Sequence, residues 1–93
     1  MNLSKEIIKK LRLEAEKIKP NVLVGKNGLS ESIIKKIDME LSAHELIKIK
    51  IHDSDIVSLK EKAPEISSKT GSVIIRLIGK TLVLYRKNPE KEK

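Results

Sequence analysis

The stretch NVLVGKNGLSESIIKKIDMEL, residues 21–41, contains an apolar run, a glycine-bounded turn and an amphipathic segment in immediate succession. The apolar run, Val22 to Val24, ends at Gly25 as a short buried strand does. Ser30 can cap the helix that follows, because its hydroxyl can accept a hydrogen bond from an unpaired N–H of the first turn. The stretch therefore predicts a strand, a loop and a helix whose core-facing positions are Ile33, Ile34, Ile37 and Leu41.

Residues 4–18 predict a helix ahead of this unit. Apolar residues recur there at helical spacing after Ser4, which can serve as the N-cap, and Pro20 ends the pattern. The opposite stripe carries several cations, so positive charges project together from one face of the helix. The apolar positions are Ile7, Ile8, Leu11, Ala15 and Ile18, and the charged positions are Lys5, Lys9, Arg12 and Glu16.

Three further segments predict strands. Residues 46–51, LIKIKI, alternate between apolar and charged side chains with the period of a β-strand. This alternation places Lys48 and Lys50 on one face, which we expect to be exposed to water. Residues 73–78 and 81–86 are rich in β-branched and apolar residues, and the Gly79-Lys80 pair between them predicts a hairpin with a type II′ turn.

A third helix is predicted from residues 53–54 to Thr70, with Gly71 as its C-terminal stop. Pro64 interrupts this segment. Because proline lacks an N–H donor and clashes with the preceding turn, we expect a kink or a break into two short helices near residues 60–64. The positions expected to face the core are Ile56, Leu59, Ala63 and Ile66.

The element order is α-β-α-β-α-β-β. Alternating strands and helices predict one compact α/β domain, in which a mixed four-stranded sheet packs with three helices. We expect this domain to span residues 1–87, and residues 88–93 to form a charged tail.

Basic residues are concentrated in two parts of the chain. Lys and Arg outnumber Asp and Glu by 20 to 13, a formal net charge of +7. Nine bases and four acids lie within residues 5–36, and four bases and no acid within residues 76–87. Between them, residues 38–65 hold seven acids and four bases. If the fold brings the two basic segments together, they would form one patch for a polyanion; the alternative is a solvated lysine-rich surface.

Several classes of protein are disfavoured. The chain has no cysteine, which excludes disulfides and thiolate metal sites and fits a reducing cytoplasm. No apolar run approaches the length of a membrane span, and no signal peptide is predicted. His44 and His52 are the only histidines, and their positions are typical of capping or surface roles. We therefore expect a cytoplasmic monomer with no enzymatic activity, cofactor, metal or small-molecule substrate.

The loop from Gly25 to Gly28 lies between a predicted strand and the start of the next helix. Its glycines allow the backbone to approach a phosphate closely, and the helix start offers unpaired N–H groups and the positive end of the helix dipole. Its spacing lacks the P-loop and dinucleotide fingerprints, so ATP and NAD are disfavoured. A GxxG loop clamps the nucleic-acid backbone in KH domains, although the same pattern also occurs in an ordinary strand-to-helix turn.

Cations in the flanking sequence favour the interpretation of residues 25–28 as a clamp on the nucleic-acid backbone over that of an ordinary turn. Tyr85 is the only aromatic residue, so a base-stacking platform is not expected, and affinity should come from phosphate contacts and shape. The residues expected to contact nucleic acid are Gly25, Lys26, Asn27, Gly28, Lys5, Lys9, Arg12, Lys19, Lys35, Lys36 and Arg86.

Three blocks of the sequence resemble the CRM domain, a family named for chloroplast RNA splicing and ribosome maturation. They occur in the family's order and spacing, and two local departures are Pro64 and Ser72, where the family often has a second glycine after Gly71. The blocks are KIKPNVLVGKNGLSESI (17–33), HELIKIKI (44–51) and TGSVIIRLIGKTLVLYR (70–86).

This resemblance implies a fold similar to the C-terminal domain of translation initiation factor three. It also implies that the loop from Gly25 to Gly28 contacts RNA and that stand-alone, YhbY-type members associate with ribosome precursors. We therefore expect the chain to bind structured, ribosomal RNA during maturation of the large subunit. Two alternatives stay open: a small architectural DNA-binding protein, and a protein-interaction module that uses Lys48 and Lys50 or the acidic middle segment.

Overall fold

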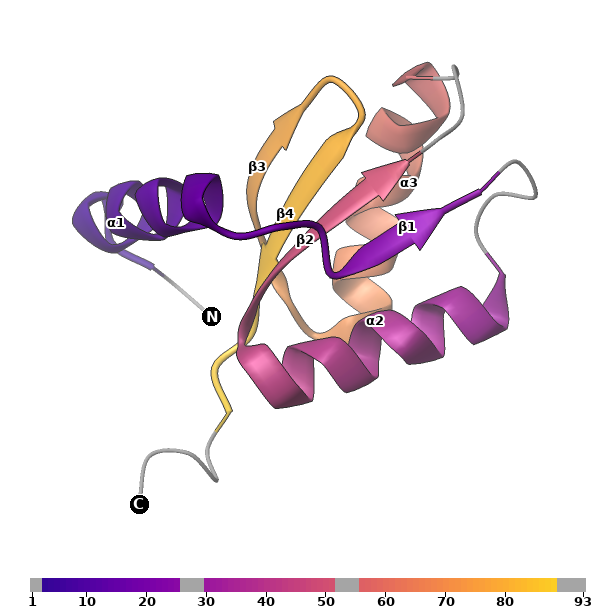
Figure 1. Cartoon of the computed structure of the whole chain (residues 1–93), viewed down its shortest axis with the longest axis horizontal. Coiled ribbons are helices and arrows are strands. Elements are labelled where there is room, and N and C mark those ends of the chain that lie inside the picture. Colours follow the sequence, from indigo (N-terminus) through magenta and orange to yellow (C-terminus); the bar gives the residue numbers. More distant parts are fainter. Residues whose placement is uncertain (1–2, 26–29, 52–55, 89–93) are drawn as a thin grey trace.

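The structure, a computed structural model of the 93-residue chain, describes residues 3–25, 30–51 and 56–88, without the side chains of residues 56–59. Its elements follow the predicted order (Figure 1). The prediction of a single α/β domain with a mixed four-stranded sheet is confirmed for the described residues. The helices are α1 (Lys5–Lys17), α2 (Glu31–His44) and α3 (Ile56–Thr70), and the strands are β1 (Val22–Val24), β2 (Leu46–Ile51), β3 (Val73–Ile78) and β4 (Thr81–Tyr85).

Serine side chains begin α1 and α2. The hydroxyl oxygen of Ser4 accepts a hydrogen bond from the N–H of Ile7 at 3.2 Å, and that of Ser30 accepts one from the N–H of Ile33 at 3.3 Å. Each bond satisfies one of the N–H groups that a helix start leaves unpaired. Both predicted helix starts are confirmed.

β2 occupies a central position in the sheet, whose strand order is β1-β2-β4-β3. β1 runs parallel to β2, with Val22 opposite Ile49, and β4 runs antiparallel to it, with Leu82 opposite the same isoleucine. β3 and β4 form the predicted hairpin, in which Gly79 has a φ of +53° as the first turn residue of a type II′ turn requires. The sheet is therefore mixed, with its two inner strands antiparallel.

The sheet separates two apolar cores, so the molecule has three layers: α1, the sheet, and α2 with α3 (Figure 1). Alternate side chains of a strand point to opposite faces, and the isoleucines of β2 all point to the α2 and α3 side. The larger core contains Val22, Val24, Ile37, Leu41, Ile47, Ile49, Ile51, Ala63, Ile66, Leu82 and Leu84, and the smaller core contains Leu11, Ala15, Ile75 and Val83.

The predicted core faces of the helices are largely confirmed. Ile37 and Leu41 of α2 are fully buried, and Ile33 and Ile34 pack against the larger core. Ile7 is an exception, because α1 meets the sheet through the flank that carries its buried residues, and Ile7 remains 46% exposed. The side chains of residues 56–59, which include two positions predicted to face the core, lie outside the described part.

α1 covers only part of its face of the sheet. Leu46 and Tyr85 pack against the smaller core beneath it. Lys48 lies at the margin, half-buried, and its ammonium group donates a hydrogen bond to the carbonyl oxygen of Ile18 at 3.2 Å. Lys50, two residues further along β2, is exposed. The expectation of a water-exposed face therefore holds only for the Lys50 end of β2.

α3 is one continuous helix that contains Pro64, so the predicted break into two helices is wrong. The side chain of Pro64 is exposed, whereas Ala63 and Ile66 are buried. The missing hydrogen bond therefore falls on the outer side of the helix, where water can satisfy the carbonyl that lacks a partner. No helix of the described residues is both long enough and apolar enough to cross a membrane.

Gly71 ends α3 as predicted, with a φ of +64° in the left-handed region. The N–H of Ser72 donates to the carbonyl of Ser67 at 3.0 Å, which is the long bond of a Schellman motif. The hydroxyl of Ser72 is buried and lies 2.7 Å from that of Thr70. A serine is therefore accommodated at this position by hydrogen bonds within the helix terminus.

The guanidinium group of Arg86 ties the end of β4 to α2 and α3. It donates to the carboxylate and carbonyl of Asp38, the latter at 2.9 Å, and to the hydroxyl of Ser42 at 2.7 Å. It also donates to the carbonyl oxygen of Thr70, at 2.7 Å. With its side chain only 20% exposed, Arg86 links three elements through one planar group.

Glu45 makes the corner between α2 and β2, with a φ of +65° that is uncommon for a residue other than glycine. Its N–H donates to the carbonyl of Leu41 at 2.9 Å, and its own carbonyl accepts from the N–H of Arg86 at 2.9 Å. Its carboxylate accepts from the N–H of Asn88 at 2.7 Å. Asn88, assigned from sequence to the tail, is therefore fixed to this corner, and residues 89–93 lie outside the described part.

We predict that Arg86→Ala lowers the free energy of unfolding by about 2 kcal/mol, because it leaves the Asp38 carboxylate and the Thr70 carbonyl without their donor. Urea denaturation measures this loss. Arg86→Lys is the control, and it should lose an intermediate amount because an ammonium group cannot reproduce the planar fork. A loss of stability below about 0.5 kcal/mol for the alanine variant would contradict the role of Arg86 in joining these three elements.

Candidate nucleic-acid interface

One end of the sheet brings together the ends of β1 and β2, the β3–β4 turn and the start of α2. The N–H of Ile51 donates to the carbonyl of Lys80 at 2.8 Å, which fastens the turn to the end of β2. Gly25 follows β1 and is exposed, and Ser30 begins α2 beyond the predicted loop. We call this region, bounded by Gly25, Ser30, Lys50 and Lys80, the loop end of the sheet.

Gly25 has no role within the described fold that requires glycine. Unlike Gly71 and Gly79, it does not have a positive φ, and no described atom lies within 4 Å of the position that its Cβ would occupy. A glycine in such a place leaves room for another molecule to approach the backbone. The other members of the predicted loop, Lys26, Asn27 and Gly28, lie outside the described residues.

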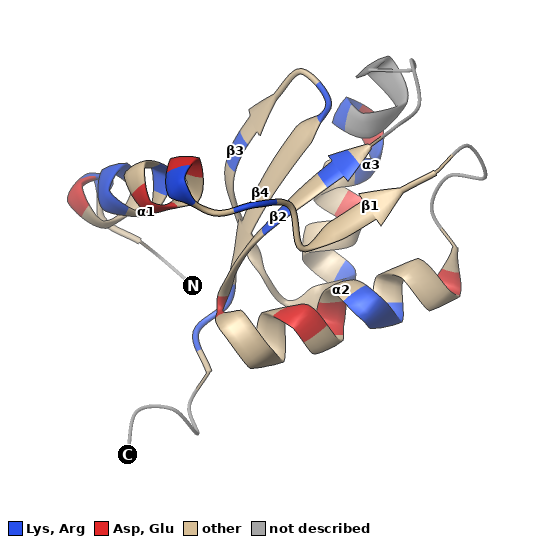
Figure 2. Cartoon of the chain, in the orientation of Figure 1, with Lys and Arg blue, Asp and Glu red and all other residues tan. Residues whose placement is uncertain are grey.

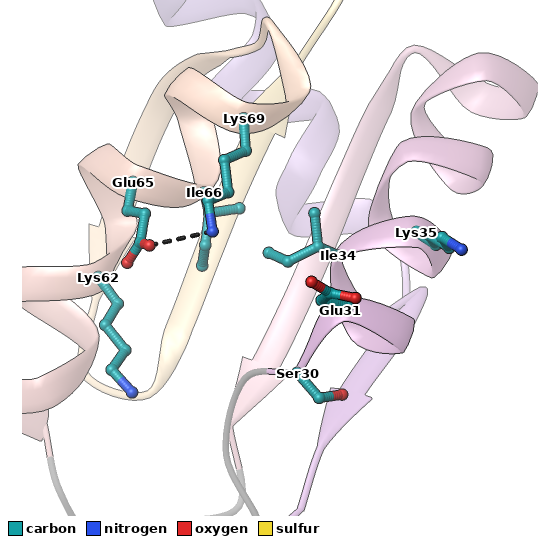
Figure 3. Close-up of a pocket in the computed structure, with 8 residues that line it drawn as sticks. All are labelled: Ser30, Glu31, Ile34, Lys35, Lys62, Glu65, Ile66 and Lys69. Atoms are coloured by element: carbon teal, nitrogen blue, oxygen red, sulfur yellow. Dashed lines mark ion pairs between the residues drawn. The ribbon is translucent and has the colours of Figure 1, made fainter.

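A groove of about 590 Å³ separates α2 from α3 next to the start of α2 (Figure 3). Ile34 and Ile66 face each other across it, and Lys62 and Glu31 stand on opposite walls. Lys35 also borders the groove, although Figure 3 shows its ammonium group directed away from α3. The groove therefore has an apolar floor and walls of mixed charge.

Two lysines of α3 that are not among the predicted contacts border this groove. Lys62 and Lys69 line it from α3, and Lys69 forms an ion pair with Glu65 at 3.1 Å. Their spacing of seven residues, with Glu65 between them, would have placed all three on one stripe of the predicted helix. The predicted contacts Lys35 and Lys36 are exposed on the first half of α2.

The predicted contacts in and after α1 lie away from the loop end. Figure 1 shows α1 at one end of the long axis, opposite the end of β1 and the start of α2. Lys5 and Lys9 are exposed on α1, and Lys19 is exposed in the connection between α1 and β1. The Nε of Arg12 donates to the carbonyl oxygen of Ile75 in β3 at 3.1 Å. The structure thus separates the predicted contacts into a group near the loop end and a group on the α1 side.

Arg86 and Tyr85 serve the fold. The predicted RNA contact Arg86 forms an ion pair with Asp38, so its charge is offset within the fold and we do not count it among the cations of the interface. No sequence pattern indicates this contact, because 48 residues separate the two side chains. Tyr85 is half-buried against the smaller core, as expected of a sheet residue, and is not displayed for base stacking.

Metal-binding side chains are not gathered in the described part of the chain. There, no cluster of three or more His, Cys, Asp or Glu side chains could hold a metal ion. His44 lies 3.3 Å from Glu40 in the last turns of α2, and its side chain is 55% exposed. This pair is a surface contact between residues one helical turn apart. His52 lies outside the described residues.

Known proteins of similar sequence are named for RNA binding. The chain is 31% identical over 93 residues to a probable RNA-binding protein of Pseudomonas aeruginosa, an alignment that covers 100% of this chain and 89% of the relative. It is 36% identical over 76 residues to an RNA-binding protein of Haemophilus influenzae, covering 82% of this chain and 77% of the relative.

A solved structure has the same fold. The solution structure of a hypothetical protein of Staphylococcus aureus, described as an RNA-binding candidate, matches with a TM-score of 0.80 and 34% identity. The match covers 94% of this chain and 91% of that one. The family model described as the CRS1 / YhbY (CRM) domain matches residues 3–86. The predicted resemblance is confirmed, and the chain belongs to the CRS1 / YhbY (CRM) domain family.

Proposed function

We propose that the chain is a non-enzymatic RNA-binding protein that holds the RNA backbone at the loop end of its sheet. The observation that carries this proposal is the exposed Gly25, whose surroundings are open and whose conformation does not require glycine. The names of the relatives support RNA as the ligand. Lys26 and Asn27 follow in the sequence and supply the polar groups that would meet phosphate or sugar.

Cations around the loop end favour a polyanion. Lys35, Lys50 and Lys80 are exposed, and none forms an ion pair with another described residue. Their charges are therefore available to phosphates, whose binding releases counterions and stabilises the complex at low salt. Because Tyr85 is the only aromatic residue and packs under α1, we infer that RNA is recognised by its backbone and shape.

We predict that Gly25→Ala lowers the affinity for a structured RNA about tenfold without lowering the melting temperature, because the added methyl group meets the RNA and no described protein atom. Fluorescence anisotropy and thermal unfolding measure the two quantities. Gly71→Ala is the matched control. Its left-handed φ makes the substitution cost about 1 kcal/mol of stability, while RNA affinity is retained. An unchanged RNA affinity of the Gly25→Ala variant would contradict the proposal that RNA contacts the chain at Gly25.

We predict that Lys26→Glu weakens binding to a ribosomal RNA fragment and reduces the slope of log affinity against log salt by about one unit. Lys10→Glu, at an exposed position of α1, makes the same change in charge on the helix at the opposite end of the long axis (Figure 1), and it should leave the slope almost unchanged. A length-matched DNA duplex, tested in parallel, should bind more weakly than the RNA. Equal losses in the two variants would show that overall charge, and not the loop, governs affinity.

We further propose that the RNA belongs to precursors of the large ribosomal subunit, as the family resemblance implies. A tagged chain recovered from cell extract should enrich large-subunit ribosomal RNA, and the Lys26→Glu variant should recover much less. Sequencing of the co-purified RNA provides the measurement. Recovery of unrelated RNA alone would remove the ribosomal assignment while leaving RNA binding intact.

A further inference from the structure

We propose that RNA also contacts the part of the sheet that α1 leaves uncovered, and that a double-helical segment held at the loop end extends across this surface. We call it the sheet-face surface and define it by Lys48, Lys50 and Arg76, with Arg12 at its margin. Among the nucleic-acid contacts predicted from sequence, only Arg12 belongs to it, whereas Lys48 and Lys50 were predicted to meet a protein partner in one alternative. The inference rests on the proposed function and assigns it a second set of phosphate contacts and a class of RNA.

Strand register places these side chains on one face. Lys48 and Arg76 both pair with Val83, which belongs to the smaller core and therefore marks the α1 side. The three residues form a row across β2, β4 and β3. The next row towards the loop end is on the same face, because successive rows on one face are two residues apart. It consists of Leu23, Lys50, Thr81 and Ile78.

A β-bulge contributes to this arrangement. Ile74 pairs with Leu84 and Arg76 with Val83, so Ile75 is an additional residue in β3. Ile75 is buried in the smaller core. Its neighbour Arg76 faces the same side of the sheet, but the side chain of Arg76 is 40% exposed. The bulge therefore fills the space beneath α1 and presents a cation next to it.

The area of the sheet that α1 covers ends between these two rows. A shallow groove of about 270 Å³ follows the boundary, with Arg12, Lys48 and Arg76 among the residues that line it. In the row beyond, Leu23 is 66% and Ile78 is 51% exposed, and Lys50 between them is exposed as well. Figure 2 shows basic segments on β2, β3 and the β3–β4 turn. This half of the face is open to solvent.

Two cations of the sheet-face surface, Arg12 and Lys48, are held in place by uncharged partners. Lys48 donates to the carbonyl of Ile18, and Arg12 to that of Ile75, so both are fixed by uncharged partners. Glu16 is the acid that pairs with this set among the described residues, 3.7 Å from Arg76. Both members of that pair are substantially exposed, so their attraction is weak and easily exchanged for another anion. The ordering cost of binding a polyanion is thereby reduced.

The shape of the surface favours a double helix over a single strand. Lys48 and Arg76 lie two strands apart, about 10 Å in the sheet. This part of the sheet offers aliphatic side chains and no aromatic one on which unstacked bases could rest. A duplex, which is recognised through its backbone across its width, matches such a broad cationic surface.

Continuity with the loop end favours RNA over a separate protein partner. A hollow of about 440 Å³, lined by Leu23, Val24, Gly25 and Lys50, joins the sheet-face surface to Gly25. An RNA whose backbone passes Gly25 therefore reaches Lys50 without crossing a helix. The same duplex can then continue towards Arg76.

The test uses the full chain and two RNA hairpins with the same loop, one with a short stem and one with a long stem. Wild type should bind the long stem at least about tenfold more tightly, and Lys50→Gln/Arg76→Gln should lose that preference. Its salt slope on the long stem should fall by about one to two units. The control Lys10→Gln/Lys17→Gln removes the same charge from exposed positions of α1 that belong to neither the sheet-face surface nor the loop end, and it should behave as wild type.

The outcomes separate this inference from the proposed function. If wild type binds neither hairpin, the proposed function fails and the inference fails with it. If wild type binds but Lys50→Gln/Arg76→Gln keeps the full stem-length preference, the sheet-face surface is overturned and RNA binding stands. Equal losses in the two double variants also overturn it, because positive charge elsewhere on the surface would then serve equally well. Circular dichroism establishes that each variant is folded.

Discussion

Burial of β2 is the constraint on which the rest of the structure depends. Its isoleucines pack beneath α2 and α3 with no exposed surface at Ile47 and Ile49, while its backbone pairs with β1 on one side and β4 on the other. Because side chains alternate, this burial forces Lys48 and Lys50 onto the opposite face. Lys48 donates a hydrogen bond to the carbonyl oxygen of Ile18 just after α1, and Lys50 is exposed to water. The two faces of one strand thus set both the core and the distribution of charge.

The incomplete cover provided by α1 explains why segment charges are a poor guide to surface charges. Residues 38–65 hold more acids than bases, yet two of their lysines lie on a basic part of the sheet. Arg76 joins them from a segment 26 residues beyond Lys50 through the ladder of β4. The net charge of a segment averages over its faces, whereas a ligand meets one face at a time. The first basic segment is divided, since α1 and the loop end lie at opposite ends of the long axis (Figure 1), and it meets the second segment where Arg12 and Arg76 line one groove.

Local features of the fold could be predicted from sequence, and long-range contacts could not. The Ser30 cap and the Gly71 stop follow from hydrogen-bonding and steric rules that involve only neighbouring residues. Arg86 was placed among the nucleic-acid contacts because its partner Asp38 is remote in sequence. The effect of Pro64 depends on which side of α3 faces water, which the tertiary packing decides. The family resemblance was visible in three blocks, because these contain the loop and all four strands of the sheet that separates the two cores.

Mapping of amide chemical-shift changes on titration of the ¹⁵N-labelled chain with a structured ribosomal RNA hairpin tests the central claim, that RNA is held at the loop end of the sheet. The account predicts the largest changes at Gly25 and its sequence neighbours, followed by Leu23, Lys50 and Thr81, with little change along the outer side of α3 around Pro64. Changes confined to α3, or spread evenly over all exposed lysines, would contradict it.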